Sequence, residues 1–470
     1  MMLNIDTMSI REMVDYQKKG LLKSTSILEH YLKRYDKYNP TLNAIVEMSS
    51  LQDLLNSAES ADSCIIQGES LGALHGIPIT VKDAMHVAGL HPSRGVKELY
   101  GEKSTKDATV LRRLKAKGAI PFGLTNVSEM CMSFDTYNLL HGRTLNPHNL
   151  SRSCGGSSGG EAVAIASGMS PGGIASDACG SVRIPAHFNG VCGFKLTQGR
   201  VPLTGQFPKE RSGLFHLTSS FAVMGRYVDD VDLLANHLHG ADGQDPDTVS
   251  VAYQDYRNCS IRGLKVGVWR GENTSVELVP AVENAVQVVE DILSKQVSLV
   301  QTITPPLVRE ACEVIWKLFV LGGDSSRGWR NLYQQMGKTE FTPEIASILQ
   351  QSEQIEMTAS EIKNAMIMRD TFRHQLNLMF NQVDILVSPV YPDVAFKNGT
   401  SMDNIDNYSF VFPFSLSGSP AIVIPVSKCP ETGMPIGIQI VGKHWNEHQI
   451  LAIASKLESC LQYSVYEQTP

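Results

Sequence analysis

Two serines and one lysine supply the chemistry that amide hydrolysis needs. That reaction requires a nucleophile, a base that later returns its proton to the leaving amine, and donors for the oxyanion. Ser181 ends a turn of small residues, 177–180, and such a turn directs successive backbone N–H groups to one point. Ser157 lies in a second glycine-rich turn, and Lys82 follows a short apolar strand pattern. We therefore consider Ser181 as a nucleophile assisted by Lys82.

A lysine accepts a proton only as the neutral amine. Its ordinary pKa of about 10.4 must therefore fall through burial or nearby positive charge. Ser157 can pass a proton between Ser181 and Lys82, because a hydroxyl both donates and accepts. A lysine at a strand end is more often a solvated edge charge. We therefore interpret Lys82 as a base only because the two serines accompany it.

Two other serine motifs compete with this interpretation. Residues 155–159, and the next frame centred on Ser158, fit the GxSxG nucleophile elbow. That elbow follows an apolar strand, whereas residues 149–154 read NLSRSC. Ser360 and Lys363 fit SxxK, but they lie in a charged, helix-like segment without a glycine turn. Both motifs lack the context that their chemistry requires.

The scaffold that positions these residues alternates helix and strand patterns, which indicates an α/β fold. We expect a central mixed β-sheet covered by helices on both faces. Residues 24–38 predict a helix that stops before Pro40, and residues 307–380 predict a mostly helical insertion. No long polar linker divides the chain, so we expect a single domain over residues 1–470. The strand patterns fall at residues 43–48, 76–83, 119–124, 263–269, 297–303, 384–388, 421–425 and 436–441.

The composition is that of an ordinary globular protein. The 470 residues are 42% hydrophobic and 19% charged, with a net charge of −7, and no basic block suggests nucleic-acid binding. Nine scattered cysteines lack metal spacing, so we expect no metal, no cofactor and a reducing compartment. No signal peptide or membrane span is predicted, which favours the cytoplasm. The expected partner is a small-molecule amide substrate, and a homodimer is an alternative to a monomer.

Five segments together resemble the amidase signature family of amide hydrolases. Each is weak alone, but all occur in order between about residue 20 and the C-terminus, and the core region covers about residues 72–230. The resemblance implies the amidase signature fold and catalysis by Lys82, Ser157 and Ser181. The segments are GIPITVKD (76–83), GRTLNP (142–147), GGSSGGE (155–161), SDACGSVRIPAHFNGVCGFK (176–195) and PIGIQIVG (435–442).

The resemblance also implies roles for the neighbouring residues. The family's bridging serine, held by a cis peptide, falls on Ser157. The family usually has glycine where Cys179 stands, and a Cβ there could restrict the turn or crowd the acyl carbon; we expect this to change the substrate range rather than the reaction. The implied supporting residues are Ser158, Ser176, Asp177 and Arg183, and the implied oxyanion-hole amides are those of Ala178, Cys179, Gly180 and Ser181.

Within the family, segments 133–147 and 205–208 (GQFP) resemble the fatty-acid amide hydrolase branch. Cys131, Met132 and Phe134 resemble residues that line its acyl pocket. Residues 307–321 are a candidate for the rest of the pocket, although an ordinary core helix explains them equally well.

We do not find the arginine-rich stretch that holds the glutamine carboxylate in the corresponding amidotransferases. A carboxylate normally binds a bidentate arginine, so we expect a neutral amide with an apolar acyl or aryl group. Two alternatives stay open. One is a protein like the A subunit of the glutamine-dependent amidotransferases, which works with partner subunits, and the other is a catalytically silent homologue.

Overall fold

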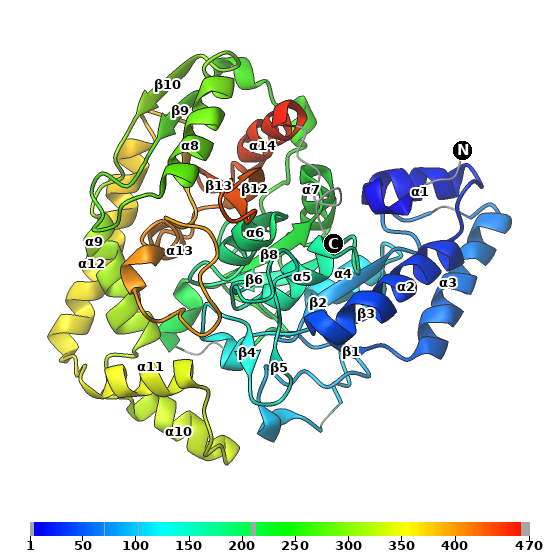
Figure 1. The fold of residues 1–470 in the computed structure, drawn as a ribbon, viewed down its shortest axis with the longest axis horizontal. Helices are drawn as coiled ribbons and strands as arrows, with labels where there is room; N and C mark the ends of the chain where they lie inside the picture. Colours follow the sequence, from blue (N-terminus) through cyan, green and yellow to red (C-terminus); the bar gives the residue numbers. More distant parts are fainter. Residues whose placement is uncertain (1–3, 70, 102, 208–212, 462–470) are drawn as a thin grey trace.

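A computed structural model describes residues 4–69, 71–101, 103–207 and 213–461. Its centre is one eleven-stranded sheet (Figure 1). The strand order is β1 (Ile45–Met48), β3 (Ile120–Thr125), β2 (Pro78–Lys82), β6 (Gly172–Asp177), β8 (Ser220–Gly225), β7 (Cys192–Lys195), β12 (Ala421–Lys428), β13 (Pro435–Gly442), β11 (Ile385–Pro389), β9 (Lys265–Val268) and β10 (Leu299–Thr302).

The sheet is mixed, as predicted. Strand β2 runs parallel to both β3 and β6, and β9 runs parallel to β11 and β10. The strands between β6 and β11 pair antiparallel. Because β2 and β6 are parallel neighbours, their carboxyl ends meet at one edge. Lys82 ends the first of these strands, and the turn that leads to Ser181 follows the second.

Helices cover both faces of the sheet, and two consecutive glycines in β6 show this directly. A Cβ on Gly172 would meet the side chain of Leu234 at 3.2 Å, whereas a Cβ on Gly173 would meet Glu161 at 2.2 Å. Successive residues of a strand face opposite sides, so α7 (Val228–Asn236) and α5 (Gly159–Ala166) lie on opposite faces. Helix α6 (Arg183–Asn189) packs beside α5, and α14 (Glu447–Leu461) packs between α7 and α8 (Pro280–Leu293).

The N-terminal part consists of α1 (Ile10–Lys18), α2 (Ser24–Leu42) and α3 (Leu51–Ile66), followed after β2 by α4 (Thr109–Lys115). The prediction that the second helix stops before Pro40 is wrong, because the helix runs through Pro40 to Leu42. Its end is held by other groups. Asn43 adopts φ 51° and donates its backbone N–H to the Asn39 carbonyl at 2.8 Å. A proline in the last turn therefore leaves the helix end intact.

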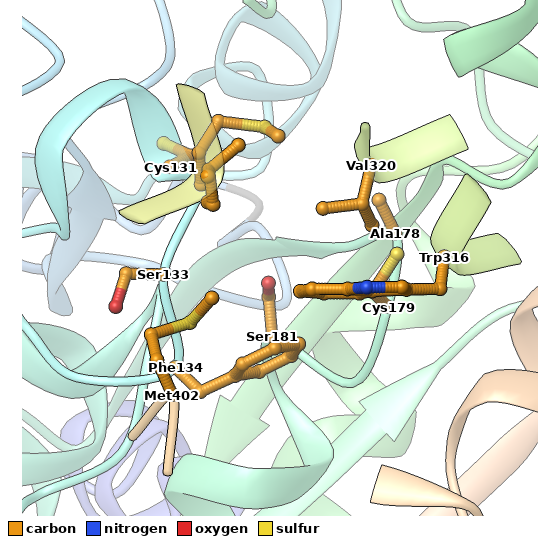
Figure 2. A pocket seen from close by; sticks show the side chains of 11 residues that line it. Cys131, Ser133, Phe134, Ala178, Cys179, Ser181, Trp316, Val320 and Met402 are labelled. Atoms are coloured by element: carbon orange, nitrogen blue, oxygen red, sulfur yellow. The ribbon is translucent and has the colours of Figure 1, made fainter. Parts of the chain in front are cut away.

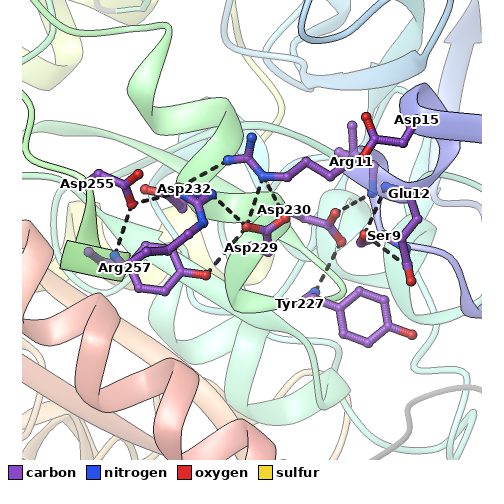
Figure 3. Close-up of polar contacts among 12 residues, drawn as sticks. Ser9, Arg11, Glu12, Asp15, Tyr227, Asp229, Asp230, Asp232, Asp255 and Arg257 are labelled. Carbon is purple, nitrogen blue, oxygen red and sulfur yellow. Dashed lines mark hydrogen bonds and ion pairs between the residues drawn. The ribbon is translucent and has the colours of Figure 1, made fainter. Parts of the chain in front are cut away.

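A network of acidic residues on α7 holds α1 against α7 (Figure 3). Arg11 forms ion pairs with Asp229 at 2.9 Å and Asp232 at 3.4 Å, and Arg257 reaches the same two carboxylates. The Asp230 carboxylate accepts the first backbone N–H of α1, that of Ile10, at 2.6 Å. None of these residues lines the cavities beside Ser181, so the network is structural.

Residues 307–380 are mostly helical, as predicted, and lie on the opposite side of the molecule from α1–α3 (Figure 1). They form α9 (Val308–Val314), the π-helical turn η7 (Ile315–Val320), α10 (Arg327–Met336), α11 (Pro343–Glu353) and α12 (Ala359–Met379). The remaining elements are β4 (Tyr137–Asn138), β5 (Gly142–Arg143), α13 (Phe412–Leu416) and the short 3-10 turns η1 (Ile5–Thr7), η2 (Lys97–Leu99), η3 (Glu129–Cys131), η4 (Gly213–Leu217), η5 (Tyr256–Asn258), η6 (Ile261–Gly263) and η8 (Ile405–Tyr408).

Candidate active site

Lys82 is buried at the end of β2, with only 1% of its side chain exposed. Its Nζ donates to the Ser157 hydroxyl at 2.7 Å and to the backbone carbonyl and the hydroxyl of Ser176, each at 3.3 Å. An ammonium has three N–H donors, and all three have partners here. When the amine is neutral, the Ser157 contact can run in reverse, with the hydroxyl donating to the Nζ lone pair.

Burial lowers the pKa of Lys82 below its ordinary value. The thiol of Cys131 and the carboxylates of Asp177 and Glu161 act in the opposite direction, but they do not outweigh the loss of hydration. Near pH 7, the Lys82 amine is therefore neutral in a larger fraction of molecules than a lysine in water. A general base requires this neutral form.

The Ser157 turn is tightly enclosed by the polypeptide. The Gly156–Ser157 peptide is cis, and a Cβ on Gly156 would lie 2.6 Å from the Ser133 carbonyl oxygen. Thr136 braces the turn from outside: its hydroxyl donates to the Gly155 carbonyl at 2.8 Å and accepts from the Gly159 N–H at 3.0 Å. Glycine is therefore needed at position 156 for close packing.

Asp177 organises the turn that carries Ser181. Its carboxylate accepts the backbone N–H of Gly180 at 2.7 Å and that of Val182 at 3.2 Å. It also forms a fully buried ion pair with Arg183, at 2.9 Å. Burial alone would raise the pKa of Asp177, but Arg183 and the backbone donors outweigh it and the pKa is lowered. The carboxylate is therefore ionised and holds the turn in shape.

Three backbone amides of this turn are available to an oxyanion. Within the part of the chain that the structure describes, the N–H groups of Ala178, Cys179 and Ser181 make no hydrogen bond. The Gly180 N–H, expected to join them, donates to Asp177 instead. Gly180 has φ +106°, and a Cβ there would meet Val411 at 2.7 Å. This position therefore requires glycine. The Gly180 N–H stabilises the conformation of the turn.

Cys179 does not strain the turn, because its φ lies outside the left-handed region. Its side chain is 8% exposed and contributes to the wall of a cavity beside Ser181. Burial raises the pKa of its thiol to about 12, so the thiol stays protonated near neutral pH. The atoms that this side chain has beyond those of glycine occupy part of the cavity wall.

An apolar cavity opens beside Ser181. Figure 2 shows the Ser181 hydroxyl directed into the space between Cys131, Phe134 and Trp316. Among the described residues that line this cavity, none carries a charge. They are Cys131, Met132, Ser133, Phe134, Ala178, Cys179, Ser181, Trp316, Val320, Ile348 and Met402.

The sequence-based pocket residues Cys131, Met132 and Phe134 all line this cavity. From the candidate segment 307–321, Trp316 and Val320 also line it, whereas Ile315, Leu318 and Phe319 are buried elsewhere. The sequence analysis missed Ser133, Ile348 and Met402. Ile348 and Met402 come from segments far from the signature region, and no local motif marks them.

A second cavity contains the polar groups. Cys131, Ala178 and Ser181 line both cavities, so the two meet at Ser181. We call them the acyl cavity and the polar cavity. The polar cavity is lined by Lys82, Met130, Cys131, Ser157, Ser176, Asp177, Ala178, Ser181, Gln206, Phe207 and Ser219. Of segment 205–208, Pro208 lies outside the described residues.

The arrangement brings Ser181, Ser157 and the buried Lys82 together around one cavity. Ser158 and Arg183, also implied by the resemblance, lie behind it: Ser158 donates its hydroxyl to the Ser176 carbonyl at 3.4 Å, and Arg183 pairs with Asp177. Among the described residues, no group of three or more His, Cys, Asp or Glu side chains is placed to hold a metal ion. None of the described helices is long and apolar enough to cross a membrane.

Comparison with known proteins identifies the family. The amidase family model matches residues 26–451. The A subunit of glutamyl-tRNA(Gln) amidotransferase from Sulfurihydrogenibium sp. (strain YO3AOP1) is 31% identical over 486 residues, covering 97% of each chain. A solved structure from a vestigial protein complex that reveals the evolutionary origins of an s-triazine catabolic enzyme has a TM-score of 0.87 at 26% identity, covering 97% of this chain and 99% of that one.

The chain therefore belongs to the amidase signature family, whose members hydrolyse amide C–N bonds. A fatty acid amide hydrolase structure has a TM-score of 0.87, but at 22% identity, covering 98% of this chain and 86% of that one, it supports the fold alone. The relatives include amidotransferase subunits, so they do not single out the fatty-acid amide hydrolase branch.

Proposed function

We propose that this protein is an amidase that hydrolyses neutral amides through Ser181, Ser157 and Lys82. Ser181 Oγ attacks the carbonyl carbon, its proton passes to Ser157 Oγ, and the Ser157 proton passes to neutral Lys82. The C–N bond then breaks as the proton returns through Ser157 to the amine nitrogen, which leaves an acyl-enzyme. Water attacks the acyl-enzyme with the same relay and releases the acid.

The observation that carries this proposal is the 2.7 Å contact between Lys82 Nζ and Ser157 Oγ inside the cavity that Ser181 also lines. The Ser181 hydroxyl itself makes no hydrogen bond to the described residues. Such contacts are often open in free enzymes and close when the substrate binds. The N–H groups of Ala178, Cys179 and Ser181, which have no acceptor among the described residues, supply the donors for the oxyanion in this proposal.

The charge-free acyl cavity favours an apolar acyl or aryl group. Its walls are aromatic, aliphatic and sulfur-containing side chains, and a carboxylate placed there would lose its hydration without gaining a partner. A preference for apolar acyl groups, like that of a fatty-acid amide hydrolase, fits these walls. We also propose that the chain acts as one domain.

The second candidate is an amidotransferase component that releases ammonia from glutamine for partner subunits. The relative at 31% identity carries the name of such an amidotransferase. Glutamine bears both a carboxylate and an ammonium, which the acyl cavity does not accommodate. Glutaminase activity of the purified chain, rising on addition of partner subunits, would favour this candidate over hydrolysis of simple apolar amides.

The test of the proposed function is active-site labelling combined with turnover. A fluorophosphonate should label wild-type protein at Ser181 in a one-to-one ratio, and Ser181→Ala should abolish both labelling and hydrolysis of an aryl amide. Labelling of a different residue would refute the nucleophile. The absence of both labelling and turnover in folded wild-type protein would instead indicate a catalytically silent homologue.

A further inference from the structure

Gln206 is a buried polar residue that the proposed mechanism does not use. Its side chain is 4% exposed and lines the polar cavity together with Lys82, Ser157 and Ser181. Its Oε1 is buried, and none of the described residues donates a hydrogen bond to it. An unpaired buried acceptor is costly, so its presence beside the nucleophile points to a ligand group as its partner.

The backbone around Gln206 is tied to the segment that follows Lys82. Gln206 pairs with Met85 in an antiparallel bridge. On either side of it, the Gly205 carbonyl accepts the His86 N–H at 2.9 Å, and the Phe207 N–H donates to the Ala84 carbonyl at 2.7 Å. The backbone at Gln206 is therefore held by the stretch that directly follows Lys82.

The orientation of a bound amide determines which substrate group faces the Gln206 side chain. In the proposed function, the acyl group occupies the acyl cavity and its carbonyl oxygen faces the backbone amides of Ala178, Cys179 and Ser181. The nitrogen must face the polar cavity, because it receives its proton from Ser157 there. A nitrogen that still carries hydrogen after presenting its lone pair to Ser157 directs that N–H away from Ser157. Gln206 is one of the polar residues that line the same cavity and could accept it.

We propose that Gln206 recognises the N–H of the scissile amide and so selects amides with a free N–H over the corresponding esters. This inference rests on the proposed function and names the substrate class of the same site. An ester oxygen has no hydrogen to donate and would place two acceptors against each other. The unpaired Oε1 therefore discriminates against esters as well as favouring amides.

The experiment compares an anilide and a phenyl ester with the same acyl group, measured by kcat/KM. Gln206→Met removes hydrogen bonding at nearly constant length. We expect it to lower kcat/KM for the anilide by about tenfold and to leave the ester unchanged or improved. Gln206→Glu keeps an acceptor oxygen and should retain most of the amide preference. Met402→Leu, in the acyl cavity, is the matched control and should change both substrates by the same factor.

Equal losses for anilide and ester in Gln206→Met would overturn the inference, since they would assign Gln206 to structure or to a bound water. A Gln206→Glu variant whose ratio of anilide to ester kcat/KM falls as far as in Gln206→Met would also overturn it. Fluorophosphonate labelling at Ser181 in each variant separates these outcomes from a failure of the proposed function, in which wild-type protein would neither label nor hydrolyse either substrate.

Discussion

The backbone N–H of Ser158 donates to the backbone carbonyl of Ser181 at 3.1 Å. This single bond joins the turn that carries the proposed relay to the turn that carries the proposed nucleophile. Asp177 holds the second turn through its backbone N–H groups, and Lys82 contacts the site through Ser157 and Ser176. Because buried contacts set the geometry of the site, substitutions that remove them should have measurable effects.

The activity should depend on pH through Lys82. Burial lowers the pKa of Lys82, and the base works only when neutral. We therefore expect kcat/KM for a neutral amide to rise with pH and level off below pH 10.5, the ordinary pKa of a lysine, with the low-pH limb reporting protonation of Lys82. Lys82→Ala should lose nearly all activity.

The control for the Lys82 prediction is Lys195, a second buried lysine. Burial lowers the pKa of Lys195 to about 7, and its Nζ donates to the Ser419 carbonyl rather than to a catalytic group. Lys195→Met should keep the low-pH limb. If the limb disappeared in Lys195→Met, the titration would belong to Lys195 and not to Lys82.

Asp177→Asn should destabilise the protein by about 3–5 kcal/mol, because it leaves the Arg183 charge buried without its partner. It should also lower activity by loosening the Gly180 and Val182 contacts. Urea unfolding measures the first effect. Asp229→Asn, which weakens partly exposed ion pairs with Arg11 and Arg257, should cost no more than about 1 kcal/mol. Similar losses in the two variants would contradict the role of burial.

Cys179→Gly should widen the acyl cavity and increase the relative kcat/KM for branched or bulkier acyl amides. The backbone should tolerate the change, since Cys179 already avoids the left-handed region. The wild-type thiol, with its pKa raised to about 12 by burial, should resist iodoacetamide at about pH 8, while the exposed Cys460 reacts. An unchanged substrate profile would show that Cys179 does not limit the acyl group.

Glu161→Gln should flatten the pH dependence of stability. Burial raises the pKa of Glu161 to about 7, above its ordinary value of 4.5, so the folded protein holds a proton that the unfolded chain releases. That contribution is complete below pH 4.5 and is lost as pH rises through about 7. The variant lacks this protonation-dependent contribution. Between about pH 5 and 7, its unfolding free energy should therefore fall with pH less steeply than that of the wild type. The two slopes should differ by up to about 1.4 kcal/mol per pH unit. Parallel curves would contradict this assignment.

Much of the fold was predictable because its signals are local. The alternation of apolar residues in PITVK and IGIQIV marks buried strands, and both appear as predicted in β2 and β13. The helix through Pro40 was not predictable, because the groups that hold its end, on Asn39 and Asn43, act through the following turn. The strand order also depends on pairings between distant segments, which no local pattern encodes.

Residue types and spacing were enough to propose which side chains carry the chemistry, and that assignment stays a prediction. Lys82, Ser157 and Ser181, together with the small residues around both serines, restrict the chemistry to a few schemes. The hydrogen-bond partners depend on the folded chain. There the Gly180 N–H donates to Asp177, and the Gln206 Oε1 has no donor among the residues that the structure describes. The physical reason is that burial and hydrogen bonding depend on contacts across the sheet between distant segments, whereas type and spacing are properties of the chain itself.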